Sequence, residues 1–121
     1  MSIFPRFGKN RSINFLELIP ERAYEWVEQE NGRVSILVPK YGTSRLGVWL
    51  ARRLKKPYIF IKLDEVGTAV WLACDGRTTI RQIGIQLQQR FGDQIEPVYE
   101  RMAIFFRVLD REKLIRWTNL N

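Results

Sequence analysis

The sequence contains no histidine and only one cysteine, Cys74. Histidine is the side chain most used for proton transfer near neutral pH, so its absence excludes Ser-His-Asp and Cys-His nucleophile schemes. The usual ligand sets of zinc sites are excluded for the same reason. A lone cysteine forms no internal disulfide, which favours a reducing compartment, and we expect a cytoplasmic protein.

Long apolar runs and nucleotide-binding loops are also missing. The longest uncharged run is Val66–Cys74, nine residues, which falls well short of the about 20 that a membrane-spanning helix needs. Residues 1–11 lack the apolar segment of a signal peptide. Gly42 and Gly47 come nearest to a glycine-rich phosphate loop, but the required lysine pattern is absent. We therefore expect a binding protein, with no catalytic residue, no metal site and no cofactor.

What the chain does have is an ordinary globular composition and an uneven charge. Its 121 residues are 45% hydrophobic and 27% charged, which fits one folded domain. The net charge of +7 falls entirely on residues 1–62, which contain 12 Lys or Arg and five Glu. The remaining residues contain eight Lys or Arg and eight Asp or Glu, so their net charge is zero. Seven of those cations follow one another with no acid between them: Lys40, Arg45, Arg52, Arg53, Lys55, Lys56 and Lys62. Such a stretch attracts an anionic partner or acts as a solubilising face.

The first half of the chain has the pattern of a small antiparallel sheet. Tyr24–Glu30 alternates apolar and polar residues, and Val34–Pro39 and Tyr58–Leu63 are rich in strand-forming residues. Asn31-Gly32 predicts a hairpin with a type I′ turn, in which both residues take positive φ. Between the second and third strands, residues 42–57 contain a short helix that Ser44 caps. Its apolar stripe consists of Leu46, Trp49, Leu50 and Leu54.

The second half changes to the helical period. Asp64 caps a helix over residues 65–74, and Thr79 with Gln82 forms a capping box for the next helix, which ends at Gly92. Pro97 opens a third helix. The apolar faces of the last two helices are Ile80, Ile83, Leu87 and Phe91, and Val98, Met102, Phe105 and Leu109. Residues 113–117 form a short strand or tail.

These elements predict an α+β fold, with a three-stranded antiparallel sheet followed by three helices in a winged-helix-turn-helix-like arrangement. We expect an N-terminal arm over residues 1–22, of which 1–14 are loose, a domain over 23–117 and a tail over 118–121. The segment 42–57 is then an insertion between the second and third strands. Oligomeric state stays open between monomer and homodimer.

Several motifs in this region resemble those of the PqqD family. They are Leu63-Asp64 at the end of a strand, Ala69-Val70-Trp71 on the following helix, and Cys74-Asp75-Gly76-Arg77-Thr78-Thr79-Ile80 with Ile83. Members of this family act in pyrroloquinoline quinone (PQQ) biosynthesis, and related domains recognise the leaders of ribosomally made, modified peptides. The resemblance implies a non-catalytic module that captures a precursor peptide and presents it to a modifying enzyme of the radical SAM type.

The resemblance also implies where the peptide binds. The guest would add as an antiparallel strand to Tyr58–Leu63 and pack against the helix after Pro97. Lys62 and Arg101 would pair with guest acids. The peptide-binding residues are then Tyr58, Ile59, Phe60, Ile61, Lys62, Leu63, Arg101, Met102, Phe105 and Phe106. The helical spacing of Met102 and Phe105 equally fits a place in the core, and Phe15–Ile19 of the same chain is an alternative occupant of the strand edge.

Three other functions remain as alternatives. A winged-helix DNA-binding regulator fits the basic charge, but Glu96 and Glu100 at the start of the would-be recognition helix repel phosphate, so nucleic acid is disfavoured as a partner. An enzyme using Asp64, Glu65 or Asp75 ranks lower, because helix capping explains the first and turn chemistry explains the last. A membrane-surface role for residues 45–56 also stays open, because Trp49 is flanked by cations.

Overall fold

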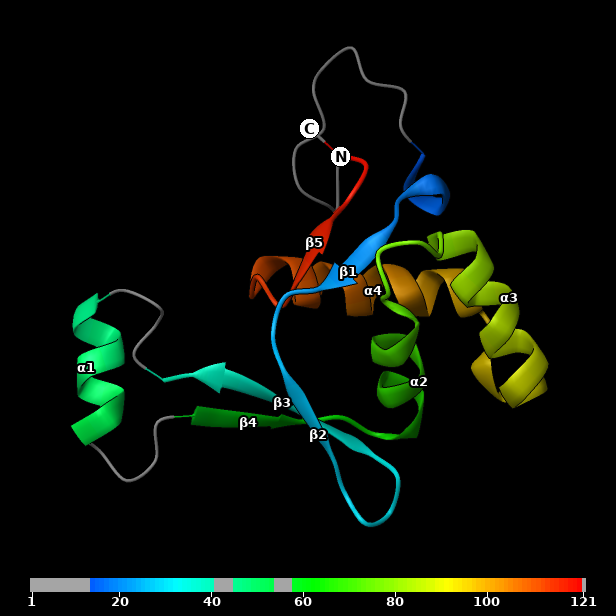
Figure 1. The fold of residues 1–121 in the computed structure, drawn as a ribbon. Helices are drawn as coiled ribbons and strands as arrows, with labels where there is room; N and C mark the ends of the chain where they lie inside the picture. Colours follow the sequence, from blue (N-terminus) through cyan, green and yellow to red (C-terminus); the bar gives the residue numbers. More distant parts are fainter. Residues whose placement is uncertain (1–13, 41–44, 54–57, 121) are drawn as a thin grey trace. The chain divides into compact units, whose positions relative to one another are not determined.

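The computed structural model describes residues 14–40, 45–53 and 58–120, which form two compact units. The sheet unit is Tyr24–Thr68, and the helical unit comprises the described residues up to Ala23 and from Ala69 onward. The α+β class, with a three-stranded antiparallel sheet and several helices, is confirmed (Figure 1). In chain order the elements are η1 Phe15–Glu17, β1 Pro20–Arg22, β2 Trp26–Glu28, β3 Val34–Pro39, α1 Arg45–Arg53, β4 Tyr58–Lys62, α2 Glu65–Ala73, α3 Ile80–Phe91, η2 Gly92–Ile95, α4 Val98–Arg111 and β5 Ile115–Trp117.

The sheet unit is built on strands β2, β3 and β4 in that order, each antiparallel to its neighbour. β3 has the predicted bounds, whereas β2 is shorter than the alternating segment 24–30. Val34 and Ile36 of β3 are buried, and the Val34 N–H donates to the Thr68 hydroxyl oxygen at 2.9 Å. Apolar burial and this hydrogen bond tie the first turn of α2 to the middle strand.

The hairpin between β2 and β3 forms at the predicted place but not with the predicted turn. Gly32 has φ +83°, and Asn31 does not have positive φ. The Gly32 N–H donates to the Gln29 carbonyl at 2.9 Å, and the Gln29 N–H donates to the Arg33 carbonyl at 2.7 Å. This is a three-residue loop in which only the final glycine needs the left-handed conformation. The Asn31 side chain accepts from the Arg33 N–H at 2.9 Å, which uses its polar group without strain.

The predicted short helix in residues 42–57 is α1, which lies between β3 and β4 in the chain (Figure 1). The Ser44 cap and Leu54 lie outside the described residues. The connection from β3 to β4 runs over residues 40–57, so no tight turn fixes the pairing of these two strands. That 42–57 is an insertion, and the division into arm, domain and tail, stay predictions.

Capping residues set the helix starts as predicted. The Asp64 carboxylate accepts from the Gly67 N–H at 2.7 Å at the start of α2. At α3 the Thr79 side chain accepts from the Gln82 N–H at 3.2 Å, and the Gln82 side chain accepts from the Thr79 N–H at 2.9 Å. Both partners of the capping box are therefore satisfied, and Gly92 ends the helix.

The core of the helical unit is made by α2, α3 and α4 with η1 and β5. Buried side chains include Trp71, Ile80, Ile83, Leu87, Val98, Met102, Phe106 and Leu109. On α4 the predicted face is right except at one place, because Phe106 is fully buried while Phe105 is only half-buried. The rings of Phe15 and Trp117 lie 6.4 and 5.8 Å from that of Phe106. These contacts draw Phe106 inward.

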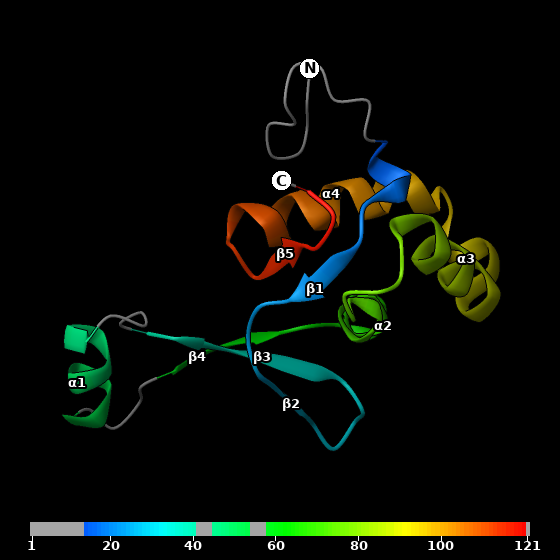
Figure 2. The ribbon, with the colours of Figure 1, turned by 45° about the horizontal axis from the view of Figure 1, so that its top comes forward.

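The sequence patterns did not predict the strand β1. It pairs antiparallel with β5, with Pro20 opposite Trp117 and Arg22 opposite Ile115 (Figure 2). Residues 113–117 are predicted to form a short strand or a tail, and the strand is present as β5, against which α4 packs. Three residues that include a proline carry too little periodicity to be read as a strand. Within the described ranges, no helix is long and apolar enough to cross a membrane.

Candidate functional site

β4 is an edge strand within the part of the chain that the structure describes. It pairs with β3 over five residue pairs, from Ser35 opposite Lys62 to Pro39 opposite Tyr58. No described strand pairs with its other side. An edge of this kind presents backbone N–H and C=O groups that an added strand can use.

The register shows which residues of β4 present those groups. The Leu63 N–H donates to the Val34 carbonyl at 2.9 Å, so Leu63 directs its backbone groups toward β3. Backbone direction alternates along an antiparallel strand. Ile59 and Ile61 therefore also face β3, while Tyr58, Phe60 and Lys62 direct their N–H and C=O groups outward.

Several large apolar side chains along β4 are exposed to solvent. Tyr58, Ile59 and Phe60 are 46%, 49% and 56% exposed. Phe60 lies opposite Leu37 on one face of the sheet, and Ile59 lies opposite Val38 on the other. Both faces of this end of the β3–β4 pair therefore offer apolar surface beside the edge.

Sequence reasoning missed the contribution of β3 to this surface. Leu37, Val38 and Pro39 are only half-buried and lie opposite Phe60, Ile59 and Tyr58. The only signal that would have found them is the β3–β4 register. A hairpin turn normally fixes such a register, but here 18 residues, 40–57, separate the two strands.

The predicted residues of the last helix lie on α4, in the helical unit, whereas β4 belongs to the sheet unit. Met102 and Phe106 are 2% and 0% exposed, which places them in the core, as the alternative reading of their spacing allows. Phe105 is half-buried. Arg101 is exposed, and its guanidinium donates to the Gln94 carbonyl at 2.8 Å. Of these four side chains, Arg101 and Phe105 have surface to offer a guest.

The alternative occupant of the edge, Phe15–Ile19, has its backbone engaged within the helical unit. The Leu18 carbonyl accepts from the Ile80 N–H, and the Ile19 carbonyl accepts from the Thr118 N–H, both at 2.9 Å. Leu18 is fully buried. In the described residues, then, this segment is part of a core and does not pair with β4.

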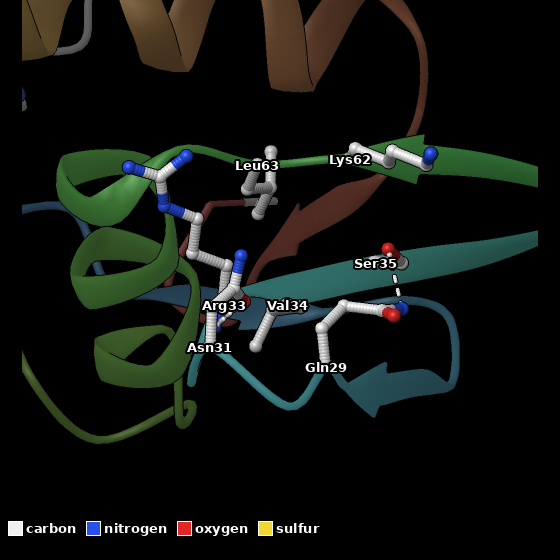
Figure 3. A pocket seen from close by; sticks show the side chains of 7 residues that line it. All are labelled: Gln29, Asn31, Arg33, Val34, Ser35, Lys62 and Leu63. Carbon is white, nitrogen blue, oxygen red and sulfur yellow. Dashed lines mark hydrogen bonds between the residues drawn. The ribbon is translucent and has the colours of Figure 1, made fainter.

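A shallow pocket of about 210 Å³ lies between the C-terminal end of β4 and the loop of the β2–β3 hairpin (Figure 3). Its lining includes a hydrogen-bonded polar pair, because the Gln29 side-chain amide donates to the Ser35 hydroxyl oxygen at 3.0 Å. Lys62 and Arg33 line it, but Figure 3 shows their side chains extending in different directions. The two cations therefore do not converge on one anion, and Lys62 instead provides a single positive charge beside the edge.

The most conspicuous motif of the sequence, residues 74–79, forms a turn. The Asp75 carboxylate accepts from the Arg77 and Thr78 N–H groups at 2.8 and 2.9 Å and from the Thr78 hydroxyl at 3.0 Å. Burial raises the pKa of the Asp75 carboxyl, but these hydrogen bonds outweigh it and hold the pKa below its ordinary value. The Gly76 N–H donates to the Pro20 carbonyl at 2.9 Å, which attaches the turn to β1.

Cys74 stands at the start of this turn and is fully buried. Its thiol donates to the Val70 carbonyl at 3.2 Å. Burial raises the pKa of the thiol to about 12, so it stays protonated and is a poor nucleophile. Across residues 14–40, 45–53 and 58–120, no three acidic or cysteine side chains gather as a metal-binding cluster.

Comparison with known proteins assigns part of this chain to a family. A family model described as Coenzyme PQQ synthesis protein D (PqqD) matches residues 58–115. No curated protein matches. No solved structure matches either. The matched region starts at the first residue of β4, contains α2, α3 and α4, and ends within β5. The matched region, residues 58–115, includes both the exposed edge strand and the Asp75 turn, and it is PqqD-like.

Proposed function

We propose that this protein is a non-catalytic module that captures the leader of a ribosomally made precursor peptide by strand addition to β4. The observation that carries the proposal is the strand Tyr58–Lys62, whose outer edge pairs with no described strand and which bears exposed apolar side chains. Outward backbone groups define the guest as an extended chain, and apolar side chains at the edge select its residues.

The family supports the same role. Proteins of coenzyme PQQ synthesis that belong to this family are accessory proteins, and related domains hold a precursor peptide for a modifying enzyme. By that analogy the partner here is a radical SAM enzyme that acts on the captured peptide. We expect this encounter to take place in the cytoplasm, where a ribosomally made precursor would be captured.

Backbone pairing alone does not account for useful affinity. Tyr58, Phe60 and Lys62 offer up to three donors and three acceptors, which at about 1 kcal/mol net each give at most about 6 kcal/mol. Micromolar binding needs about 8 kcal/mol, and ordering a flexible peptide costs a further 2–5 kcal/mol or so. The guest must therefore also bury side chains.

The surface beside the edge supplies this second part. The remaining gap is about 4–7 kcal/mol, and burying one Leu or Phe of the guest contributes about 1.5–3 kcal/mol, so about three such contacts are needed to close it. On β4 the apolar partners are Tyr58, Ile59 and Phe60, and Leu37 of β3 extends the same face as Phe60. Lys62 would attract guest carboxylates and set the orientation more than the affinity.

The test uses amide hydrogen exchange and calorimetric titration of the full chain with synthetic leader peptides from small precursor genes encoded beside this one. Among the amides of β4 in the free protein, we expect protection at Ile59 and Ile61 and none at the other three, because only these two N–H groups face β3. Bound peptide should add protection at Tyr58, Phe60 and Lys62. Heat of binding without protection at these three amides would place the peptide elsewhere, and no heat with any leader would reject the proposal.

DNA binding by a winged helix remains the alternative, and the arrangement does not favour it. η2 and Glu96-Pro97 separate α3 from α4, which is longer than the usual turn of three or four residues. Glu100 lies in the first turn of α4. A gel shift with duplex DNA at low salt is the control, and we expect none that involves α4.

A further inference from the structure

One segment of the chain carries all of its net charge. Residues 31–63 contain no Asp or Glu and eight cations: Arg33, Lys40, Arg45, Arg52, Arg53, Lys55, Lys56 and Lys62. The whole chain has 20 cations and 13 acids, so the remaining residues have 12 cations, 13 acids and a net charge of −1. A partner of this segment is therefore anionic.

Within this segment, α1 exposes large apolar side chains. Leu46, Trp49 and Val48 are 66%, 51% and 42% exposed, whereas Gly47 is buried. A helix of nine residues is marginal in water unless packing supports it. The described side chains of α1 provide little such packing, so the helix gains stability from any surface that covers Leu46 and Trp49.

The same helix carries apolar and cationic side chains on one face. Leu46, Trp49 and Arg53 follow at intervals of three and four residues, which places them on one face. The Arg53 guanidinium lies over the Trp49 ring, 5.0 Å from its centroid. Arg45 and Arg52 are exposed, and no acid occurs in the helix. Indole rings with adjacent arginines are typical of helices that lie at the boundary between lipid headgroups and acyl chains.

We propose that α1 is a membrane-surface helix, which inserts Leu46 and Trp49 into the headgroup region of a bilayer that contains anionic lipids. The arginines contact lipid phosphates, and the flanking lysines of the acid-free segment strengthen the attraction. A nucleic acid would use the same cations but would leave Leu46 in water. This inference rests on α1 and not on the β4 edge, so it stands or falls separately from peptide capture.

The experiment is co-sedimentation of the full chain with vesicles of phosphatidylcholine alone and of equal parts phosphatidylcholine and phosphatidylglycerol. We expect binding to the anionic vesicles and little to the neutral ones. Binding should shift the tryptophan emission to shorter wavelength, and a Trp49→Phe variant should bind while losing most of that shift. Equal binding to both vesicles, or none to either, contradicts the proposal.

Two variants of equal charge test the location. Arg52→Glu with Arg53→Glu, on α1, and Arg107→Glu with Arg111→Glu, on α4, each lower the net charge from +7 to +3. Each unit of charge lost near an anionic surface weakens binding by about fivefold, so the α1 variant should lose at least about 100-fold. The α4 variant should lose less than about tenfold if α1 is the contact. Equal losses in the two variants would show that only the net charge matters.

A third variant separates insertion from charge attraction. Leu46→Ser with Trp49→Ser keeps every cation and should reduce vesicle binding by at least about tenfold, because two apolar side chains no longer enter the interface. Unchanged vesicle binding by this variant, or equally tight binding of the parent chain to duplex DNA at the same salt concentration, would overturn the membrane assignment.

Discussion

The ring of Tyr99 on α4 lies directly over Gly84 on α3, in the space that a Cβ atom at residue 84 would occupy. Tyr99 is held there, because its hydroxyl donates to the Arg81 carbonyl at 3.2 Å. Gly84 is buried. The packing of α3 on α4 therefore depends on the absence of a side chain at this position.

Gly84→Ala should lower the free energy of unfolding by about 1–3 kcal/mol, because the added methyl forces the Tyr99 ring out of its place. Chemical denaturation measures this. In a Tyr99→Ala background the clash is gone, and the same Gly84→Ala change should stabilise the helix by up to about 1 kcal/mol. A destabilisation of equal size in both backgrounds would contradict this explanation.

Phe60→Pro should weaken peptide capture while leaving the sheet folded. The Phe60 N–H points away from β3, so proline removes a donor that only the guest uses, and its ring obstructs the edge. We expect affinity for a bound leader to fall at least about tenfold.

Two matched variants control this result. Phe60→Val keeps the N–H and should retain part of the affinity, and Ile61→Pro removes a donor that faces β3 and should unfold the sheet unit. The dissociation constants come from calorimetry, and folding is checked by circular dichroism. If Phe60→Pro and Phe60→Val bind equally well, strand addition is wrong.

Cys74 should make stability fall at alkaline pH. Burial raises the pKa of its thiol from 9.0 to about 12, so the neutral form is favoured in the folded state. This contribution is fully present below pH 9.0 and is lost as pH rises towards 12, by up to about 1.4 kcal/mol per pH unit. Cys74→Ala should reduce that slope, measured by denaturation over the alkaline range. Rapid labelling of the native thiol by iodoacetamide would contradict its burial.

Asp75 should make stability fall at acid pH. Its pKa is held below 3.8 by hydrogen bonds that the unfolded chain lacks, so the charged form favours folding above 3.8, and the contribution is lost as pH falls through the lower folded value. Asp75→Asn should flatten the acid limb of the stability curve. Asp93→Asn, which removes an exposed carboxylate from η2, is the control of equal charge, and equal flattening in both variants would contradict this explanation.

Local chemistry explains which parts of the fold could be predicted. Asp64, Thr79 with Gln82, and Gly92 set helix ends through groups within a few residues, and these predictions are confirmed. β1 was missed because its stability comes from pairing with β5, almost a hundred positions later, as with Glu21 opposite Arg116. On α4 the sequence predicted that Phe105 is buried, but Phe106 is buried instead. Its contacts with Phe15 and Trp117, which are distant in sequence, decide which of the two rings enters the core.

The candidate site also has one part that could be predicted from the sequence and one part that could not. The strand Tyr58–Lys62 was evident from its composition, and its place at the edge follows from the order of three strands. Helical spacing placed Met102 and Phe105 on one apolar face but could not distinguish a core position from a surface groove. In the structure Met102 is buried and Phe105 is half-buried. The binding role of all ten predicted residues stays a prediction, and the amide experiment tests it for the five that lie on β4.

The edge of β4 also bears on how the protein behaves at high concentration. Exposed edge strands with apolar side chains normally promote self-association into extended sheets. Here two chains meeting border to border would bring together two segments of eight cations each, and their mutual Coulomb repulsion opposes that encounter. Added salt screens this repulsion between the two chains, so aggregation of the free protein should increase with ionic strength.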